Sequence, residues 1–297
     1  MSIATLIAAD SLESGAISEA CDRLNSAGLD PAEIIWIEPA LAADIGFSGV
    51  IDVARLALQP MEAHFDIAVQ SGAHRRKMLL VSDMDSTIIM VECIDELADY
   101  AGIKPEIAAI TERAMAGDLD FAEALTARVA LLAGLDENVI AECLRERVRP
   151  MPGAVELVRT MTAWGAHTML VSGGFTSFTD PVAAEIGLIE VHANVLEVAD
   201  GKLTGRLCGA IVDAAAKRAF LEAAVASKGL KTEQVLAVGD GANDIPMIVA
   251  AVERQGLGVG YHPRPALAQA ANFSVRHSDL TALLLAQGVA KEHWVMA

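Results

Sequence analysis

Two acidic residues at the end of an apolar run are the first feature of this sequence that could do chemistry. Asp83 and Asp85 lie in the segment Asp83-Met84-Asp85-Ser86-Thr87, directly after the run at 78–82. Side chains two apart on an extended chain point to the same side, so both carboxylates can face one reacting centre. Asp, Ser and Thr also favour helix N-caps, so an acidic turn that caps a helix is an alternative interpretation.

Glycine-containing segments follow two further apolar runs. Residues 168–172 lead into Ser172-Gly173, where backbone N–H groups at a helix N-terminus could bind phosphate. An ordinary glycine turn explains that segment equally well when it is taken alone. Residues 235–239 lead into Gly239-Asp240-Gly241, followed by Asn243 and Asp244. Asp83 and Asp240 could together supply the carboxylate oxygens that Mg²⁺ prefers, and a tight turn capped by Asn243 is compatible with this.

The net charge of −18 bears on what the chain can bind. Nucleic acid needs clustered Lys and Arg, so we expect no nucleic-acid partner. An acidic chain that binds a phosphate ester needs a metal ion or a placed cation, and Lys217 is the candidate. A solvated helix lysine is the alternative interpretation of Lys217.

The apolar runs predict the fold that would bring these residues together. Buried strands are expected at 78–82, 168–172, 235–239, 256–260 and 273–275. Helical patterns at 153–164, 214–227, 244–252 and 266–271 lie between most of them, and Asp200-Gly201 predicts a hairpin within 189–207. Alternating buried strands and helices predict an α/β fold with a Rossmann-like, doubly wound parallel sheet. Ligands of such sheets bind at the carboxyl ends of the strands.

Two regions fall outside the alternating pattern. Four helices are expected between 93 and 150, and they would form a cap over the carboxyl end of the sheet. Residues 1–76 are expected to form a separate small α+β domain, with strands at 4–9 and 34–37 and a helix at 16–27. The basic run at 74–77 is interpreted as a solvated linker to the second domain at 77–297.

The combined motifs resemble the haloacid dehalogenase-like superfamily of phosphotransferases. Its four motifs match Asp83-x-Asp85-Ser86-Thr87, Ser172-Gly173, Lys217 and Gly239-Asp240-Gly241-x-Asn243-Asp244. The resemblance implies that Asp83 is the nucleophile and Asp85 the general acid and base. It also implies that Asp83, Asp240 and the main-chain carbonyl of Asp85 hold Mg²⁺. The phosphoryl group would be bound by Ser172, Gly173 and Lys217, with Asn243 and Asp244 in support.

The cap carries a further resemblance, to the phosphoserine phosphatase family. It rests on Val91-Glu92-Cys93, Met115 in Arg113-Ala114-Met115-x-Gly117, Phe121 and the run at 125–132 that contains Arg128. The resemblance implies that Glu92 meets the ammonium group of phosphoserine and Arg128 its carboxylate, with Met115 and Phe121 nearby. Arg offers a planar fork suited to a carboxylate, although a surface ion pair with Glu123 is the alternative for Arg128. The implied activity is the last step of serine biosynthesis.

Other functions stay open at this point. Phosphoryl transfer from phosphoserine to homoserine would use the same site, and a sugar phosphatase would share the fold. A non-catalytic amino-acid sensor is a third reading, and residues 1–76 could be a degenerate ACT-like domain. No stretch is expected to span a membrane, and the N-terminus lacks a basic leader, so a cytoplasmic location is expected. Four dispersed cysteines indicate neither zinc nor disulfides, and a homodimer is compatible with the sequence.

Overall fold

The computed structural model describes residues 1–115 and 118–296, and it contains two β-sheets. The first sheet has the antiparallel order β2-β3-β1-β4. Its elements follow one another as strand, helix, strand, strand, helix, strand, which is the ferredoxin-like arrangement. They are β1 (Ser2–Ile7), α1 (Ser14–Ser26), β2 (Asp30–Glu38), β3 (Ala42–Ser48), α2 (Ile51–Leu58), the 3-10 helix η1 (Gln59–Ala63) and β4 (Asp66–Ser71).

Strands β1, β3 and β4 of this first sheet are buried on both faces. Leu6, Ile45 and Val69 pack with α1 and α2 on one face, while Ile7 and Ala42 join the cluster that contains helix α12 on the other. Strand β2 is an open edge, and its apolar side chains Ile34, Ile35 and Trp36 are exposed. The sequence predicted β1, α1 and part of β2, but it missed β3, α2 and β4.

The second sheet has the order β11-β10-β9-β5-β6-β7-β8, in which only β8 runs antiparallel to its neighbour. The expected α/β architecture is confirmed, including the hairpin. The strands are β5 (Leu79–Ser82), β6 (His167–Phe175), β7 (Glu190–Ala199), β8 (Lys202–Cys208), β9 (Val235–Gly239), β10 (Leu257–Tyr261) and β11 (Phe273–Val275).

Helices cover both faces of this sheet, which explains why its central strands are continuous apolar runs rather than alternating ones. One face packs against α9 (Ala214–Ser227), α10 (Ile245–Glu253) and α11 (Pro265–Ala270). The other face packs against α7 (Ala154–Ala163), α8 (Thr176–Ile186) and α12 (Ala282–Ala286). Short 3-10 helices are η2 (Thr232–Gln234), η3 (Ala242–Asp244) and η4 (Lys291–His293). No helix among the described residues is long and apolar enough to cross a bilayer.

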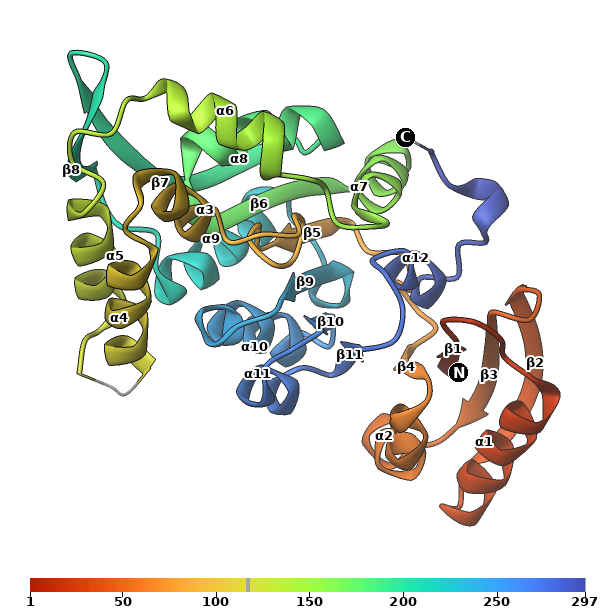
Figure 1. The fold of residues 1–297 in the computed structure, drawn as a ribbon. Helices are drawn as coiled ribbons and strands as arrows, with labels where there is room; N and C mark the ends of the chain where they lie inside the picture. The colour runs from red at the N-terminus through yellow and green to blue at the C-terminus, as the bar shows by residue number, and fades with distance from the viewer. Residues whose placement is uncertain (116–117, 297) are drawn as a thin grey trace.

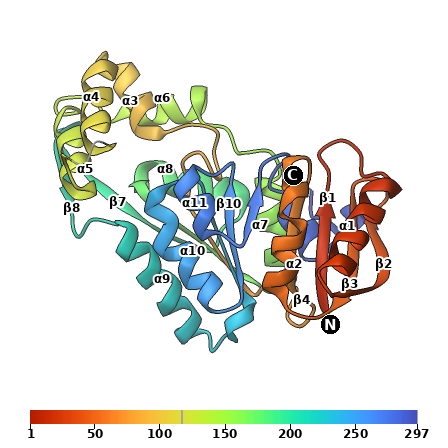
Figure 2. The same cartoon turned by 90° about the horizontal axis from the view of Figure 1, so that it is seen from below.

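Four further helices follow β5, as the sequence predicted: α3 (Cys93–Ala101), α4 (Lys104–Met115), α5 (Phe121–Ala130) and α6 (Asn138–Arg147). The side chain of Asp120 accepts a hydrogen bond from the N–H of Glu123, and the Glu123 side chain caps Asp120 in return, which fixes where α5 begins. Figures 1 and 2 show these cap helices and the first sheet at opposite ends of the molecule.

The basic run at 74–77 is not the solvated linker that we expected. Lys77 is only 1% exposed, because its ammonium group donates hydrogen bonds to the carbonyls of His74 and Glu233. The Arg75 guanidinium forms an ion pair with the buried Asp44 of β3, with Nη2 2.6 Å from Oδ1. This segment therefore fastens the first sheet to the second.

Candidate active site

The site begins at the carboxyl end of β5, where Asp83 leaves the sheet. The main-chain N–H of Met84 donates to Asp83 Oδ1 at 2.7 Å, which orients the carboxylate. The chain then turns tightly, because the Met84 carbonyl accepts the N–H groups of Thr87, Ile88 and Ile89. Ser86 sits in this turn with a φ of 54°, a left-handed conformation that is uncommon for a residue with a side chain.

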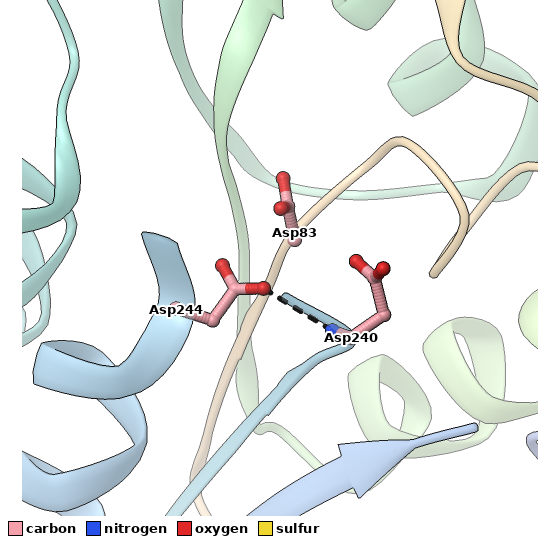
Figure 3. A group of neighbouring side chains, drawn as sticks. All are labelled: Asp83, Asp240 and Asp244. Atoms are coloured by element: carbon pink, nitrogen blue, oxygen red, sulfur yellow. Dashed lines mark hydrogen bonds between the residues drawn. The ribbon is translucent and has the colours of Figure 1, made fainter. Parts of the chain in front are cut away.

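Asp240 and Asp244 come from the neighbouring strand β9 and the turn after it. The carboxylate of Asp244 accepts the N–H groups of Asp240 and Gly241, both at 3.1 Å. Gly239 is required there, because a Cβ atom on it would lie 2.3 Å from Asp244 Oδ2. The carboxylates of Asp83, Asp240 and Asp244 each place one oxygen within 4.8 Å of the others (Figure 3). Parallel pairing of β5 with β9 brings these residues together.

Lys217 is the cation of this site. Its ammonium nitrogen lies 2.6 Å from Asp83 Oδ2 and 2.7 Å from Asp244 Oδ1, and its side chain is 1% exposed. Burial acts to lower the pKa of Lys217, but the charges of Asp244 and Asp83 outweigh burial and hold that pKa above its ordinary value. Lys217 therefore stays charged at neutral pH and is not a solvated helix lysine.

The acidic cluster fits a divalent metal ion. Asp240 is partly buried, and burial with the charges of Asp83 and Glu92 raises its pKa to about 6, as expected where carboxylates crowd together. No hydrogen bond from the described residues reaches the main-chain carbonyl of Asp85. Both oxygens of Asp244 already bind Lys217 and backbone N–H groups. The oxygens of Asp83 likewise accept from Met84, Lys217 and Asn243. The cluster of Asp83, Asp240 and Asp244 could hold a divalent metal ion, which favours oxygen ligands.

Asp85 lies beside Asp83 in an environment that favours a protonated carboxyl group. Burial, followed by the charges of Glu92 and Asp83, raises its pKa well above the usual range. Hydrogen bonds from the main chain and thiol of Cys93 oppose that rise. Oδ1 of Asp85 is buried and has no hydrogen-bond partner among the described residues. A carboxyl group of this kind can donate a proton at neutral pH.

The predicted phosphate-binding residues lie inside strand β6, and not at a strand–helix junction as we expected. β6 continues to Phe175 and α8 begins at the next residue. The pairing of β6 with β7 shifts register between Val171 and Phe175, so Ser172 and Gly173 lie in an irregular part of the strand. Ser172 is 1% exposed, and its hydroxyl oxygen accepts the N–H of Gly174 at 2.9 Å. Asn243 reaches the same centre, since its Nδ2 donates to Asp83 Oδ2 at 3.2 Å.

Asn194 of β7 supports this strand, and the sequence analysis missed it. Its Nδ2 donates to the Gly173 carbonyl and its Oδ1 accepts the N–H of Val212, each at 2.8 Å. The side chain is 2% exposed. The available signal was an asparagine within a strand, where this residue type is depleted.

The cap supplies the remaining candidates. Ser86 donates a hydrogen bond to Glu92 Oε1 at 2.7 Å, and Glu92 is the N-cap of α3. Arg128 of α5 is partly buried, its Nε donates to the Ala124 carbonyl, and it interacts electrostatically with Asp95, Glu92 and Asp85. Its expected alternative partner, Glu123, instead caps the start of α5.

Phe121 and Met115 complete the predicted set. A Cβ atom added to Gly173 would lie 2.9 Å from Cζ of Phe121, so the first residue of α5 covers the glycine of β6. Met115 is the last residue of α4, and its side chain lies outside the described part of the structure.

Comparison with known proteins agrees with this geometry. The family model of haloacid dehalogenase-like hydrolases matches residues 80–248. This chain belongs to the haloacid dehalogenase-like hydrolases. Within that family it is similar to phosphoserine phosphatases, which confirms the resemblance found in the sequence. The phosphoserine phosphatase of Streptomyces coelicolor is 43% identical over 259 residues, which cover 86% of this chain and 62% of that protein.

Solved structures give the same relationship. The unliganded structure of a probable phosphoserine phosphatase from Vibrio cholerae is 31% identical, with a TM-score of 0.77, and the match covers 98% of this chain and 88% of that one. A phosphoserine phosphatase studied as a phospho-aspartyl intermediate analogue is 36% identical, with a TM-score of 0.64, over 70% of this chain and 98% of that one. This chain spans 62% of the length of the Streptomyces relative, so the two proteins differ in extent.

Proposed function

We propose that this chain is a Mg²⁺-dependent phosphatase that hydrolyses O-phospho-L-serine to L-serine and phosphate. The observation that carries the proposal is the position of Asp83. Its carboxylate lies 2.6 Å from the Lys217 ammonium group and shares a metal-sized cluster with Asp240. A carboxylate placed between a fixed cation and a metal site is suited to attack a phosphate dianion, which would otherwise repel it.

The substrate would lie between the sheet and the cap. Lys217, Ser172 and the N–H of Gly173 would bind the phosphoryl oxygens. The Arg128 guanidinium would bind the substrate carboxylate in a bidentate manner, and Glu92 would accept from the ammonium group. The Glu92–Arg128 pair supports an amino-acid phosphate over a sugar phosphate, because a sugar lacks the two charges that this pair would recognise.

In the first step, an Asp83 oxygen forms a bond to phosphorus while the bond between phosphorus and the serine oxygen breaks. Asp85 donates its proton to the departing serine oxygen, and Asp83 becomes an aspartyl-phosphate. In the second step, Asp85 takes a proton from a water molecule that attacks phosphorus. The bond between phosphorus and Asp83 then breaks, and phosphate leaves.

The remaining residues position these groups. Mg²⁺, held by Asp83, Asp240 and the carbonyl of Asp85, would supply positive charge that offsets the developing negative charge on the phosphoryl oxygens. Asn243 and Asp244 hold Asp83 and Lys217 in place. Phe121, which covers Gly173, would exclude bulk water from the phosphoryl group during the first step.

Substitution of Asp83 by Asn tests the nucleophile. The variant keeps the size of the side chain and the acceptor oxygen for Met84 but loses the attacking charge. We expect phosphate release from L-phosphoserine to fall by at least about 10³-fold, with unchanged circular dichroism. Turnover that survives in this variant, or in the wild type with excess EDTA, would refute the proposed chemistry.

Arg128→Ala tests the identity of the substrate. Turnover of L-phosphoserine should fall by about 10²-fold or more, because the substrate carboxylate loses its partner. Turnover of p-nitrophenyl phosphate, which has no carboxylate, should change little. Equal losses on both substrates would show that Arg128 does not recognise the carboxylate. Product analysis with added homoserine separates hydrolysis from transfer to an alcohol.

The same proposal covers the organisation of the chain. We divide it into a small ACT-like domain at 1–76 and a phosphatase domain at 77–297 with its cap at about 93–150. A cytoplasmic location and a role in serine biosynthesis belong to the same proposal, and the similarity to phosphoserine phosphatases supports them. The open edge of β2 supports a homodimer.

A further inference from the structure

The β7–β8 hairpin reaches from the second sheet to the cap, and Figures 1 and 2 both show β8 beside helix α5. β7 pairs with β6 only as far as Asn194, which lies opposite Phe175, the last residue of β6. From Val195, which lies opposite Cys208, β7 pairs with β8 instead. The proposed phosphatase mechanism uses none of the residues at 195–208.

The outer edge of β8 is paired with the cap segment that follows α5. Asp136 and Lys202 lie opposite each other in an antiparallel bridge. Three main-chain hydrogen bonds join the two segments. They run from Gly134 N–H to the Leu203 carbonyl (2.8 Å), from Leu203 N–H to the Leu135 carbonyl (2.9 Å) and from Glu137 N–H to the Gly201 carbonyl (3.0 Å). The hairpin therefore binds the cap through its backbone, as one strand binds another.

Gly205 allows the end of α5 to lie directly on β8. A Cβ atom on Gly205 would lie 2.9 Å from the Cβ atom of Ala133 and 3.0 Å from the carbonyl oxygen of Ala130, the last residue of α5. The φ of Gly205 is 79°, in the left-handed region that favours glycine. A residue with a side chain could fit at this position only if α5 moved away from the hairpin.

Apolar packing supports the same contact. Leu196 and Leu203 of the hairpin belong to the buried cluster that also contains Leu125 and Val129 of α5. Leu203 is 2% exposed and Val129 is 1% exposed. Burial of such side chains stabilises the arrangement. Hydrogen bonds, a close backbone contact and packing therefore all hold the end of α5 against the hairpin.

Helix α5 carries two residues of the proposed substrate site. Phe121 at its first position covers Gly173, and Arg128 lies in its last turn. The Leu131 N–H donates to the Arg128 carbonyl at 3.2 Å, so the turn that carries Arg128 continues directly into the segment that pairs with the hairpin. Because α5 spans only 10 residues, fixing its last turn also fixes the position of Arg128.

The base of the same hairpin contacts the proposed phosphate-binding residues. Asn194 donates to the Gly173 carbonyl and accepts the Val212 N–H, each at 2.8 Å. Val212 precedes Asp213, the N-cap of the helix α9 that carries Lys217. The hairpin therefore connects the residues proposed for the phosphoryl group with the helix proposed to bind the substrate carboxylate.

We propose that the β7–β8 hairpin positions Arg128 for recognition of the substrate carboxylate, by holding the last turn of α5 at a fixed place relative to Gly173. Gly205 is the positioning residue of this contact, because it acts through α5 and touches no substrate. The role in recognition rests on the proposed hydrolysis of phosphoserine, whereas the attachment of the cap to the hairpin does not.

Gly205→Ala tests the positioning, and Gly209→Ala is its matched control. The two glycines have nearly the same φ, 79° and 80°. In the described part of the chain, a Cβ atom on Gly209 would meet nothing within 4 Å beyond its chain neighbours. Both variants therefore carry similar backbone strain, but only Gly205→Ala pushes α5 away from β8.

Steady-state kinetics with two substrates measures the effect on recognition. We expect kcat/KM for L-phosphoserine to fall at least about tenfold in Gly205→Ala alone, mainly through a higher KM. Turnover of p-nitrophenyl phosphate, which has no carboxylate for Arg128, should change by less than about twofold. Leu203→Val loosens the same contact without backbone strain, so it should show a smaller loss with the same preference for L-phosphoserine.

Hydrogen exchange measures the attachment without any substrate. The amides of Gly134, Leu203 and Glu137 should be protected in the wild type and in Gly209→Ala, because all three donate across the contact. They should exchange at least about tenfold faster in Gly205→Ala. Unprotected amides in the wild type, or equal exchange in the two glycine variants, would overturn the attachment.

Two kinetic outcomes would overturn the positioning role. One is an equal loss in both glycine variants or on both substrates, which would reduce the effect to backbone strain. The other is faster exchange in Gly205→Ala with unchanged turnover of L-phosphoserine, because Arg128 would then not depend on the hairpin. A wild type that releases no phosphate from L-phosphoserine would refute the proposed function and the role in recognition, while hydrogen exchange would still report the attachment.

Discussion

Two lysines of this chain are each 1% exposed, yet their environments have opposite effects on their charge. At the carboxyl edge of the second sheet, Asp83 and Asp244 surround Lys217 and raise its pKa. At the junction between the sheets, Lys77 donates to two main-chain carbonyls, and burial lowers its pKa to about 8. Burial alone therefore does not define a functional lysine, because the neighbouring groups decide which protonation state is stable.

Buried aspartates in the same two regions show a parallel. Asp244 accepts two backbone N–H groups in the turn after β9, and Asp66 accepts those of three consecutive residues after β11. Both carboxylates organise a loop. Within residues 1–115 and 118–296, Asp244 but not Asp66 also contacts a buried ammonium group, and Asp244 but not Asp66 belongs to a carboxylate cluster tight enough to hold a metal ion. Asp66 at the junction therefore holds the two sheets together, whereas Asp244 belongs to the candidate active site.

Replacing each lysine by methionine should separate the two regions most strongly. Lys217→Met leaves Asp83 and Asp244 buried without their cation, so we expect the free energy of unfolding to fall by about 3–5 kcal/mol. Phosphate release should fall by at least about 10²-fold. Urea unfolding and initial rates measure the two effects. Lys77→Met is the control and should keep the wild-type rate. Similar losses of activity in both variants would remove the distinction.

The pH dependence of stability should identify Lys77. Its pKa is about 8 in the folded chain and about 10.4 when unfolded. Between these values the unfolded state binds more protons, so this group makes the free energy of unfolding rise with pH. The rise should total about 3 kcal/mol. Urea unfolding from pH 7 to 11 should show it as a difference between the wild type and Lys77→Met. A constant difference across that range would contradict the lowered pKa.

The smallest expected effect in this comparison comes from Asn194, a buried side chain without charge. Asn194→Ala removes hydrogen bonds to the Gly173 carbonyl and the Val212 N–H without changing any charge. We expect a loss of about 1–3 kcal/mol in unfolding free energy, since two buried polar groups lose their partners. The Michaelis constant for L-phosphoserine should rise, because Gly173 is no longer held. Asn194→Asp keeps the acceptor for Val212 but buries a carboxylate against the Gly173 carbonyl, so it should lose at least as much stability as the alanine variant. Full stability in the alanine variant would show that water replaces the side chain.

Most strands of the second sheet and the two central carboxylates of the site could be predicted from the sequence. Its strands are buried on both faces and therefore appear as continuous apolar runs. Asp83 and Asp240 directly follow two such runs, and parallel pairing brings the ends of these strands to one edge. The positions of both carboxylates could therefore be predicted without any knowledge of their contacts.

The first sheet and the junction could not be predicted in the same way. β3 contains Asp44 and Gly46, which weaken the strand pattern, and Asp44 is stable there only because Thr5 and Arg75 bind it from distant positions in the chain. Lys77 likewise depends on the carbonyl of Glu233, 156 residues away. Tertiary structure decides which partners these side chains meet. Local composition therefore predicted a solvated linker at 74–77, where Lys77 is buried.

The unpaired edge at β2 affects how copies of this chain meet in solution. Its outward side chains Ile34, Ile35 and Trp36, with free backbone groups along an edge strand, form a template for another strand. Repulsion between molecules that each carry a net charge of −18 opposes that encounter. The range of this repulsion shrinks from about 30 Å in 0.01 M salt to about 3 Å in 1 M salt. We therefore expect concentrated salt to favour edge-to-edge association and dilute buffer to keep the molecules apart.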